Sequence, residues 1–316
     1  MRRKVKMSPK VSVIIPTKNA GSKFDSVLKA IFECKAGIEL EVIVVDSGSS
    51  DNTRTIASRY PVNLIEIAPS RFTHGLARNL GAKSAKGDIL VFITQDATPV
   101  NQNWLLNLLK NFHDETVAGV YGRQMPENNS SPLERFFLQY LYPEKKLVKQ
   151  SINPDNCLLT EIFFSNVNSA MRKSVWENNK FDEGLIMSED QDWAKRVLAV
   201  GKKIIYDPES AVRHSHRYTI KEIIQRNFDS GMSLKGLVNA PLKRSVSYEM
   251  TYLKSGFLFF LKNRLYVYLL IFPLYEAARL MGFFLGFYNR FLPLSFKKCI
   301  SQNKTYWKCN SEDSAK

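Results

Sequence analysis

The sequence has few cysteines, four in 316 residues, and none of them form a C-x-x-C pair. Cysteines this sparse do not make a disulfide framework in a chain of this length. We therefore expect a protein of a reducing compartment, on the cytoplasmic side of the cell.

Two common phosphate-binding motifs are also missing. Neither G-x-G-x-x-G nor G-x-x-x-x-G-K-[ST] occurs anywhere in the chain. Both motifs cradle phosphates with the backbone of a glycine-rich loop. Their absence counts against a dinucleotide-binding fold and against a P-loop nucleotide hydrolase.

Long hydrophobic runs are absent as well. The basic start is followed only by the short apolar run Val11 to Ile15, which Pro16 ends, so no signal peptide is predicted. Between Tyr252 and Pro293 the longest charge-free run is the eleven residues from Leu265 to Tyr275. A bilayer requires about 18 residues, so we expect no spanning helix.

Positive charge is plentiful and unevenly placed. The net charge is +15, with five Lys or Arg in residues 1–10 and a balance of +8 in residues 241–316, which leaves +2 for residues 11–240. Basic ends around a nearly neutral middle indicate attraction to an anionic surface. Nucleic acid and an anionic membrane leaflet are the two candidates.

The middle segment alternates between short apolar runs and amphipathic periods. This pattern predicts βαβ units, which place neighbouring strands in parallel and define an α/β fold. The predicted strands are residues 11–16, 40–46, 63–67, 89–94, 117–121, 163–170 and 203–206, and the predicted helices are 24–32, 52–60, 75–85, 104–112, 189–201 and 219–235. Residues 124–160 look irregular, as a lid or a mobile loop would.

Isolated carboxylates follow two of these strands. Asp46 ends the second strand and Asp96 follows the fourth. Ligands of open α/β sheets gather beyond the carboxyl ends of the strands, so we expect Asp96 to hold a metal ion that holds a diphosphate. Asp51 is either a helix cap or a ligand contact. Arg78 and Asn79 are either exposed or bind a pyrophosphate near a helix start.

Two further groups of polar residues could complete a site. Glu189, Asp190 and Asp192 open a helix, where acids either complement the helix dipole or carry chemistry. His214 and His216 lie two apart in an extended segment and therefore point the same way, which suits a metal or phosphate site.

The last part of the chain mixes aromatic residues with cations. Between Lys254 and Arg290, phenylalanine, tyrosine and leucine alternate with lysine and arginine. Such segments form either short interfacial helices at a membrane surface or helices that pack on the preceding domain.

Several motifs, taken together, resemble those of the inverting family 2 glycosyltransferases, which have the GT-A fold. The motifs are Val11-Ser-Val-Ile-Ile-Pro16, Asp46-Ser-Gly-Ser-Ser-Asp51, Ala77-Arg78-Asn79, Thr94-Gln-Asp-Ala97, Ser188-Glu-Asp190 and His214-Ser-His216. The forms Thr-Gln-Asp-Ala and His-Ser-His are similar to those of bacterial rhamnosyltransferases. The resemblance implies a basic tail at 1–10, a GT-A domain at 11–240 with a mainly parallel sheet and flanking helices, and a helical, membrane-associating extension at 241–316.

The resemblance also implies roles for individual residues. Asp190 is the expected catalytic base, and Asp96, with His214 or His216, is expected to bind Mg²⁺ or Mn²⁺, although Thr94 replaces the first acid of the family's D-x-D element. The acceptor would contact Asn166, Glu189 and Trp193. The nucleotide-sugar donor would contact Pro16, Thr17, Asn19, Asp46, Asp51, Arg78, Asn79, Gln95 and Asp96.

The implied activity is transfer of L-rhamnose from dTDP-rhamnose to a lipid-linked or polysaccharide acceptor of a bacterial surface glycan, such as O-antigen or capsule. The enzyme would lie peripherally at the inner face of the cell membrane and would not bind nucleic acid. Its C-terminal helices could also form the contacts of an oligomer. A UDP-hexose or UDP-HexNAc donor is one alternative. A nucleotidyltransferase and a non-enzymatic protein that binds nucleic acid or an anionic surface are alternatives of another class.

Overall fold

The computed structural model describes residues 10–34, 37–304, 306 and 307. The predicted basic tail therefore lies almost wholly outside the described residues. The strands are β1 (Val11–Thr17), β2 (Leu40–Asp46), β3 (Val62–Glu66), β4 (Ile89–Ile93), β5 (Thr98–Pro99), β6 (Val117–Met125), β7 (Leu147–Gln150), β8 (Asn168–Arg172) and β9 (Lys203–Arg213).

Twelve α-helices accompany these strands in the described part of the chain. They are α1 (Lys23–Phe32), α2 (Thr53–Ala57), α3 (His74–Ser84), α4 (Trp104–Leu109), α5 (Pro132–Leu141), α6 (Leu159–Ile162), α7 (Lys173–Asn178), α8 (Glu189–Ala199), α9 (Ile220–Leu234), α10 (Leu242–Lys262), α11 (Tyr268–Phe287) and α12 (Leu294–Ile300). Three 3-10 turns are also present, η1 (Pro69–Arg71), η2 (Lys110–His113) and η3 (Asn289–Phe291).

One sheet of nine strands organises the molecule. Its order is β3-β2-β1-β4-β8-β6-β9-β5, and β7 also pairs with β9. Alternate residues of β1 enter two different cores, since Val13 packs with α1 and α4 whereas Ile14 packs with α3 and α8. Burial of both faces explains why the strands read as continuous apolar runs.

The α/β fold with flanking helices is confirmed, but the sheet is mixed. Strands β1 to β4 are parallel, as the βαβ pattern predicts. Strand β8 then enters between β4 and β6 and runs antiparallel to both, while β6 and β9 are parallel and β5 and β7 are antiparallel to β9. An apolar run shows that a strand is buried but not in which direction it runs. The sequence pattern therefore could not predict the antiparallel strands in the second half of the sheet.

The segment 124–160 is more regular than expected. Strand β6 continues to Met125, and the aromatic stretch after it forms α5. The Ser131 side chain caps this helix by accepting a hydrogen bond from the Glu134 N–H, and Pro132 occupies its first turn. Phe136 of α5 is buried against Tyr252, Phe260 and Phe272 of the C-terminal helices.

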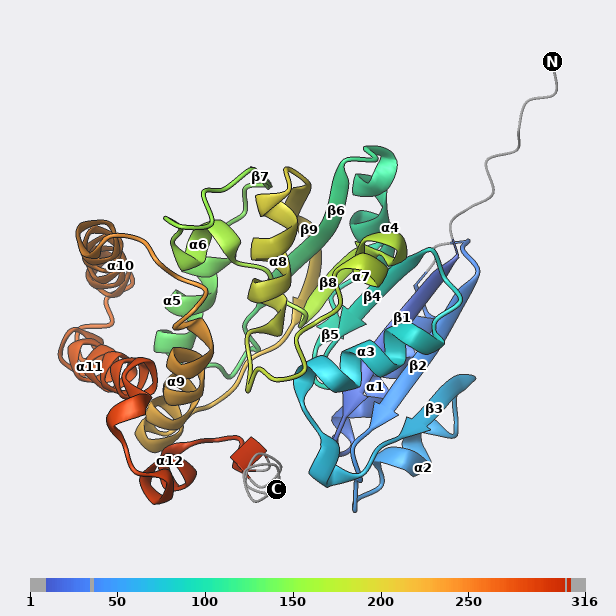
Figure 1. Cartoon of the computed structure of the whole chain (residues 1–316), viewed down its shortest axis with the longest axis horizontal. Coiled ribbons are helices and arrows are strands. Elements are labelled where there is room, and N and C mark those ends of the chain that lie inside the picture. The colour runs from blue at the N-terminus through green and yellow to red at the C-terminus, as the bar shows by residue number, and fades with distance from the viewer. Residues whose placement is uncertain (1–9, 35–36, 305, 308–316) are drawn as a thin grey trace.

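The C-terminal helices are long and lie beside α5 and α9, at the opposite end of the molecule from β1 to β3 (Figure 1). Glycines let α9 and α11 approach closely, because a Cβ atom at Gly286 would lie 2.0 Å from the Phe228 carbonyl oxygen. The same holds at Gly282, where a Cβ would lie 2.4 Å from the Ile224 carbonyl. This part of the chain thus packs on the preceding domain.

One helix among the described residues, α11, is long and apolar enough to cross a membrane by length and composition alone. The length of the longest charge-free run did not reveal this helix, because Glu276 and Arg279 lie inside it and end the run. These two side chains form an ion pair with 2.5 Å between Arg279 Nε and Glu276 Oε2. Core helices of other proteins pass the same test, so the helix alone assigns no membrane span.

Candidate active site

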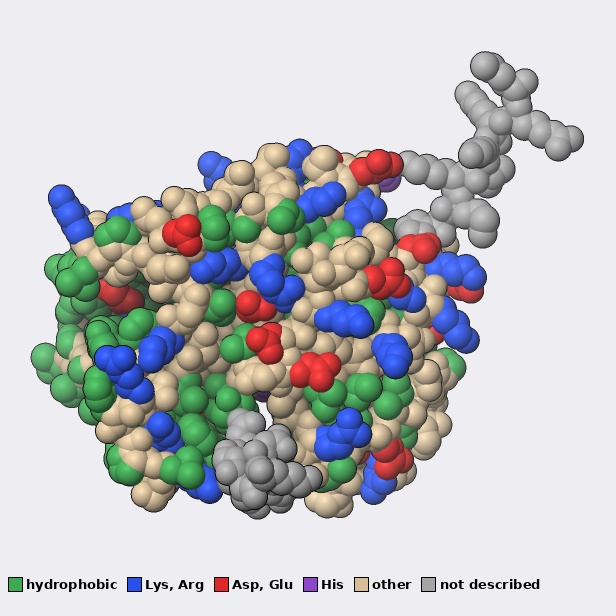
Figure 2. All heavy atoms as spheres, viewed as in Figure 1, with side chains coloured by type: hydrophobic (Ala, Val, Ile, Leu, Met, Phe, Trp, Pro, Cys, Tyr) green, Lys and Arg blue, Asp and Glu red, His purple; other side chains and the backbone are tan. Residues whose placement is uncertain are grey.

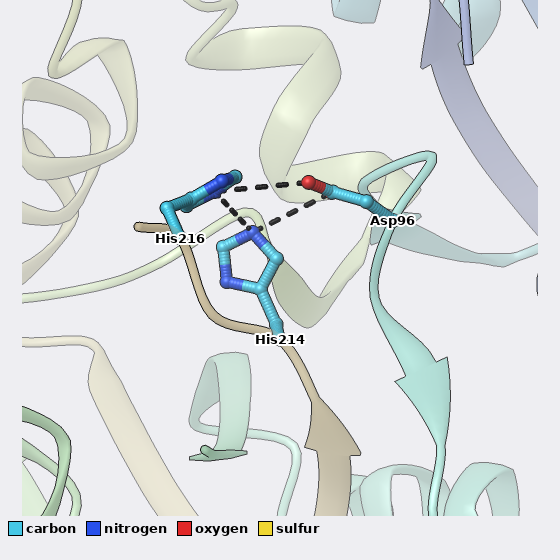
Figure 3. Close-up of side chains that lie close together, drawn as sticks. All are labelled: Asp96, His214 and His216. Atoms are coloured by element: carbon cyan, nitrogen blue, oxygen red, sulfur yellow. Dashed lines mark hydrogen bonds and ion pairs between the residues drawn. The ribbon is translucent and has the colours of Figure 1, made fainter. Parts of the chain in front are cut away.

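A compact cluster of one carboxylate and two imidazoles lies at the carboxyl ends of β4 and β9. Figure 3 shows Asp96, His214 and His216 pointing toward one another. His214 Nε2 lies 3.4 Å from Asp96 Oδ1, and His216 Nε2 lies 3.7 Å from Asp96 Oδ2. The two histidine Nε2 atoms are 2.9 Å apart. The predicted proximity of these three side chains is therefore present.

The sheet brings the cluster together. Strand β5 begins two residues after Asp96 and pairs with β9, with Thr98 opposite Arg213. Asp96 is consequently held next to His214, the residue that follows β9. His214 and His216 share a side because the segment is extended, as the two-residue spacing predicted.

Gln124 of β6 orients His214. Its Nε2 donates to the Tyr142 hydroxyl and, over 3.0 Å, to Ser165 Oγ, which leaves Oε1 facing His214 Nδ1 at 2.9 Å. An acceptor at this point keeps the proton on Nδ1 and leaves the Nε2 lone pair toward Asp96. Sequence reasoning missed Gln124, since a glutamine inside an apolar strand carries no motif.

The protonation states of the cluster suit a cation. Burial raises the pKa of Asp96, but the neighbouring His214 and then His216 outweigh it, so the pKa lies well below its usual range. Burial, followed by the neighbouring His214, lowers the pKa of His216 to about 4. At neutral pH the carboxylate is ionised and the His216 imidazole is neutral, which are the forms that bind metals.

The donor set also fits a divalent cation. One ligand atom from each of the three side chains lies within 4.8 Å of the others. Carboxylate oxygen suits Mg²⁺ and Mn²⁺, and imidazole nitrogen suits transition metals. Beside the cluster, Glu134 Oε1 accepts the His216 N–H, and its Oε2 is buried without a partner in the described part of the chain.

A second acidic group opens α8. Asp190 Oδ2 accepts a 3.0 Å hydrogen bond from the backbone N–H of Asn166. Burial, followed by the charge of Glu189, raises the pKa of Asp190 to about 7. A carboxylate with a pKa near the working pH can accept a proton and release it again, which is what a general base requires.

Glu189 and Arg78, expected to contact the acceptor and the donor, pair with each other in this structure. They form a buried ion pair, with 2.6 Å between Arg78 Nη1 and Glu189 Oε1, and their side chains are 7% and 4% exposed. Burial raises the pKa of Glu189, but Arg78 and then His74 outweigh it, so Glu189 stays ionised. Neither charge is free to contact a sugar or a phosphate.

Asn79 and Trp193, also expected to contact ligands, make contacts within the chain in this structure. The Asn79 amide bonds to the Phe181 backbone and to Trp176 Nε1, and so ties α3 to the segment before α8. Trp193 is fully buried against Phe164 and therefore cannot stack on an acceptor sugar in this conformation. Asn166 is 1% exposed and acts on Asp190 through its backbone.

Asp46 shapes its own loop. It is fully buried, and its carboxylate accepts hydrogen bonds from the Gly48 and Ser49 N–H groups and from the hydroxyls of Ser49 and Thr17. The expected direct contact with a nucleoside is therefore not formed by this carboxylate as it stands. Its neighbour Pro16 is half-buried in β1.

The remaining predicted donor residues lie at the same sheet edge. Asn19 is exposed, and its side chain accepts the Ser50 N–H. Gln95 brackets the Lys18 backbone with both ends of its amide. Asp51 is exposed and accepts hydrogen bonds from Thr53 and from the Gly21 N–H, so it joins two loops and also caps the start of α2. The Thr53 hydroxyl lowers the pKa of Asp51.

A covered α/β sheet with a metal-competent cluster at its edge and a separate carboxylate of raised pKa is the arrangement expected of a group-transfer enzyme of the GT-A class. The family model that matches is "Glycosyl transferase family 2", over residues 12–179. The chain belongs to this family and is a glycosyltransferase.

Relatives and solved structures agree with this membership. The chain is 36% identical to the O-antigen chain rhamnosyltransferase WbaN of Salmonella anatum, over 95% of this chain and 96% of that protein. It is 34% identical to RfbN of Salmonella typhimurium, which bears the same description, over 94% and 96%. The mannosyltransferase PcManGT from Pyrobaculum calidifontis, solved with GDP-Man and Mn²⁺, superposes with a TM-score of 0.65 at 18% identity, over 90% of this chain and 89% of that one.

Family membership decides between the classes of function. The nucleotidyltransferase and the non-enzymatic alternatives lose their support, because the fold and sequence belong to a glycosyltransferase family. A nucleotide-sugar donor and a glycan acceptor follow from the class. The Asp96 cluster offers a donor set for a divalent metal.

Proposed function

We propose that the protein is an inverting rhamnosyltransferase that transfers L-rhamnose from dTDP-rhamnose to a lipid-linked or polysaccharide acceptor of a bacterial O-antigen. Two relatives of almost the same length carry the description O-antigen chain rhamnosyltransferase, which supports the donor sugar and the glycan. The observation that carries the chemistry is the pairing of a metal-competent cluster at Asp96 with a separately tuned carboxylate, Asp190.

Asp190 acts as the general base in this proposal. Its carboxylate is fixed by the Asn166 N–H and accepts the proton of an acceptor hydroxyl. The hydroxyl oxygen then bonds to the anomeric carbon from the face opposite the diphosphate, and the bond from that carbon to the diphosphate oxygen breaks. Direct displacement inverts the anomeric configuration.

Asp96, His214 and His216 form the leaving-group side. These residues would hold Mg²⁺ or Mn²⁺, and Gln124 keeps the His214 Nε2 lone pair available for it. A bound divalent ion supplies positive charge that stabilises the departing nucleoside diphosphate. The loops at Asn19, Asp51 and Gln95 border the same sheet edge and are the proposed nucleoside-binding surface.

A donor panel tests the function. Purified protein is incubated with radiolabelled dTDP-rhamnose, UDP-hexose or UDP-HexNAc and a lipid-linked acceptor, and the product's anomeric configuration is read by NMR. We expect transfer from dTDP-rhamnose with inversion. Efficient transfer only from a UDP-sugar would replace the proposed donor, and retention of configuration would reject the mechanism.

The base assignment has a matched control on the same helix. Asp190→Asn should reduce transfer by about 10²-fold or more while leaving dTDP binding nearly unchanged. Asp192→Asn alters a carboxylate two residues away that is paired with Arg196 at 2.9 Å, and should leave transfer nearly intact. Equal loss in both variants, or full activity in Asp190→Asn, would remove Asp190 from the role.

We also propose that the C-terminal helices attach the enzyme to the inner face of the cell membrane. Figure 2 shows hydrophobic side chains gathered at the left edge, over α10 and α11. The exposed apolar residues there include Leu242, Met250, Leu258, Tyr266, Val267, Leu270, Leu274, Met281, Phe284 and Phe291. Exposed Lys254, Lys262, Arg264 and Arg290 lie among them and favour an anionic leaflet.

Flotation with vesicles tests this attachment. Leu274 and Val200 are each 71% exposed, but only Leu274 lies on the C-terminal helices. Leu274→Glu should weaken binding to phosphatidylglycerol-containing vesicles, whereas Val200→Glu should not. The exposed apolar side chains of α10 and α11 could instead pair two copies of the chain. In that case wild-type protein would be dimeric by sedimentation, and Leu274→Glu would make it monomeric without changing flotation.

A further inference from the structure

A row of rings leads outward from the metal-competent cluster. His214, His216 and Tyr218 occupy every second position after β9, with ring centroids 4.5 Å and 5.2 Å apart along the row. Arg226 of α9 continues it, because its guanidinium carbon lies 5.4 Å from the centroid of the Tyr218 ring. Its Nη1 also donates to the Tyr218 hydroxyl over 2.8 Å.

Arg226 differs from the other cations around this row because its guanidinium lies over one of the rings. Lys23 pairs with Glu127 at 3.0 Å, Arg213 donates to the Pro126 carbonyl, and Arg217 donates to the Asn129 carbonyl. Arg226 is exposed, and no carboxylate pairs with it among the residues that the structure describes. Its guanidinium lies over the Tyr218 ring, which in turn lies beside His216 of the cluster.

A divalent cation on Asp96 would neutralise only part of the charge of a diphosphate, because the Asp96 carboxylate itself offsets one of the two positive charges of the cation. The first acid of the D-x-D element is Thr94, so Asp96 is the sole carboxylate of the three clustered side chains. A guanidinium binds two phosphate oxygens at once with its planar fork, and stacking on a ring restricts it before the ligand arrives. Arg226 on Tyr218 has both properties.

We propose that Arg226, stacked on Tyr218, binds a diphosphate beside the Asp96–His214–His216 cluster. This inference rests on the proposed function and adds a phosphate-binding residue outside the motifs that defined the site. The diphosphate has two sources in a transfer to a lipid-linked acceptor: the nucleotide of the donor, or the lipid diphosphate of the acceptor. A lipid diphosphate at the membrane can reach Arg226, because α9, which carries Arg226, packs against α11, one of the two helices with exposed apolar side chains.

The test compares Arg226→Gln with Lys221→Gln, an exposed cation on the same helix. One arm measures dTDP binding with Mn²⁺ by calorimetry. The other measures flotation with phosphatidylcholine vesicles that contain either undecaprenyl diphosphate or undecaprenol. Loss of a charge-assisted contact should weaken binding in one arm by about tenfold or more. Lys221→Gln should match wild type in both.

The arms separate the two sources. Weaker dTDP binding assigns Arg226 to the donor, and loss of the preference for undecaprenyl diphosphate over undecaprenol assigns it to the acceptor. Tyr218→Phe keeps the ring but removes the hydroxyl, so it should give a smaller loss in the same arm. If Arg226→Gln folds normally by circular dichroism and binds like wild type in both arms, the inference is overturned.

Failure of the proposed function would look different. A wild-type protein that transfers rhamnose while Arg226→Gln binds normally loses only the role of Arg226. A wild-type protein that neither binds dTDP nor transfers rhamnose loses the proposed donor itself, whatever the variant does.

Discussion

The pH dependence of turnover tests how Asp190 is tuned. With a pKa of about 7, Asp190 is ionised in about half of the molecules at that pH and in about one tenth at about pH 6. The ionised form accepts the proton, so kcat should rise with pH to a plateau above about pH 8. One pH unit below the pKa, kcat should be about tenfold lower than the plateau.

Replacing Glu189 should shift the acid limb of this profile, that is, the low-pH range over which kcat rises with pH. The Glu189 charge raises the pKa of Asp190. One pKa unit corresponds to about 1.4 kcal/mol, an energy that a buried unit charge on the neighbouring residue readily reaches at an effective dielectric of about 20. Glu189→Gln should therefore shift the limb to lower pH by about one unit or more, with the unpaired Arg78 acting in the same direction.

The same variant should be less stable. Removing one partner of a buried ion pair costs about 3–5 kcal/mol, so the urea midpoint of the variant should fall. Bound donor stabilises the folded variant, so its activity can still be measured. The assay is kcat against pH at saturating donor for wild type, Glu189→Gln and Asp192→Asn. Asp192→Asn should keep the wild-type limb. A wild-type profile that is flat between about pH 5.5 and pH 8, or an unshifted limb in Glu189→Gln, would refute the reasoning.

Three further predictions concern the cluster, the helix packing and the core. Gln124→Ala should weaken Mn²⁺ binding by about 10–100-fold in calorimetry, because His214 loses the acceptor that orients it; unchanged affinity would contradict that role. Gly286→Leu should lower stability by about 1–3 kcal/mol or more in urea unfolding, since its Cβ would meet the Phe228 carbonyl, and an unchanged midpoint would argue against the close helix approach. Trp193→Ala should cost about 3–5 kcal/mol while the KM for acceptor in the folded fraction changes little; a selective rise in that KM would restore a binding role.

Local pattern was sufficient for elements whose partners are close in sequence. The first four long strands were predicted within a residue or two, because apolar runs separated by amphipathic helices permit only a covered parallel sheet. The shared side of His214 and His216 likewise follows from a two-residue period. Their position beside Asp96 depends on the pairing of β5 with β9, which no local pattern encodes.

Contacts with residues far away in the sequence decide the surroundings of the other predicted site residues. Arg78 lies in α3, where an exposed or phosphate-binding role was reasonable, but its partner Glu189 is 111 positions away. Trp193 lies three residues after Asp190 and yet turns into the core against Phe164. In α5, the capping Ser131 and Pro132 were helix signals in the sequence, but neighbouring prolines made the segment look irregular.

Because Arg78 is buried, its charge pairs with Glu189 in the core, which the motifs alone did not indicate. Arg78 keeps Glu189 ionised in the core, and that fixed negative charge, together with burial, holds the adjacent Asp190 at a pKa suited to a base. An Arg78 that left this pair to meet a phosphate would leave Glu189 buried without its partner, which is costly. We therefore expect the positive charge for a diphosphate to come from a cation on the Asp96 cluster and from Arg226, whose guanidinium is held on the Tyr218 ring.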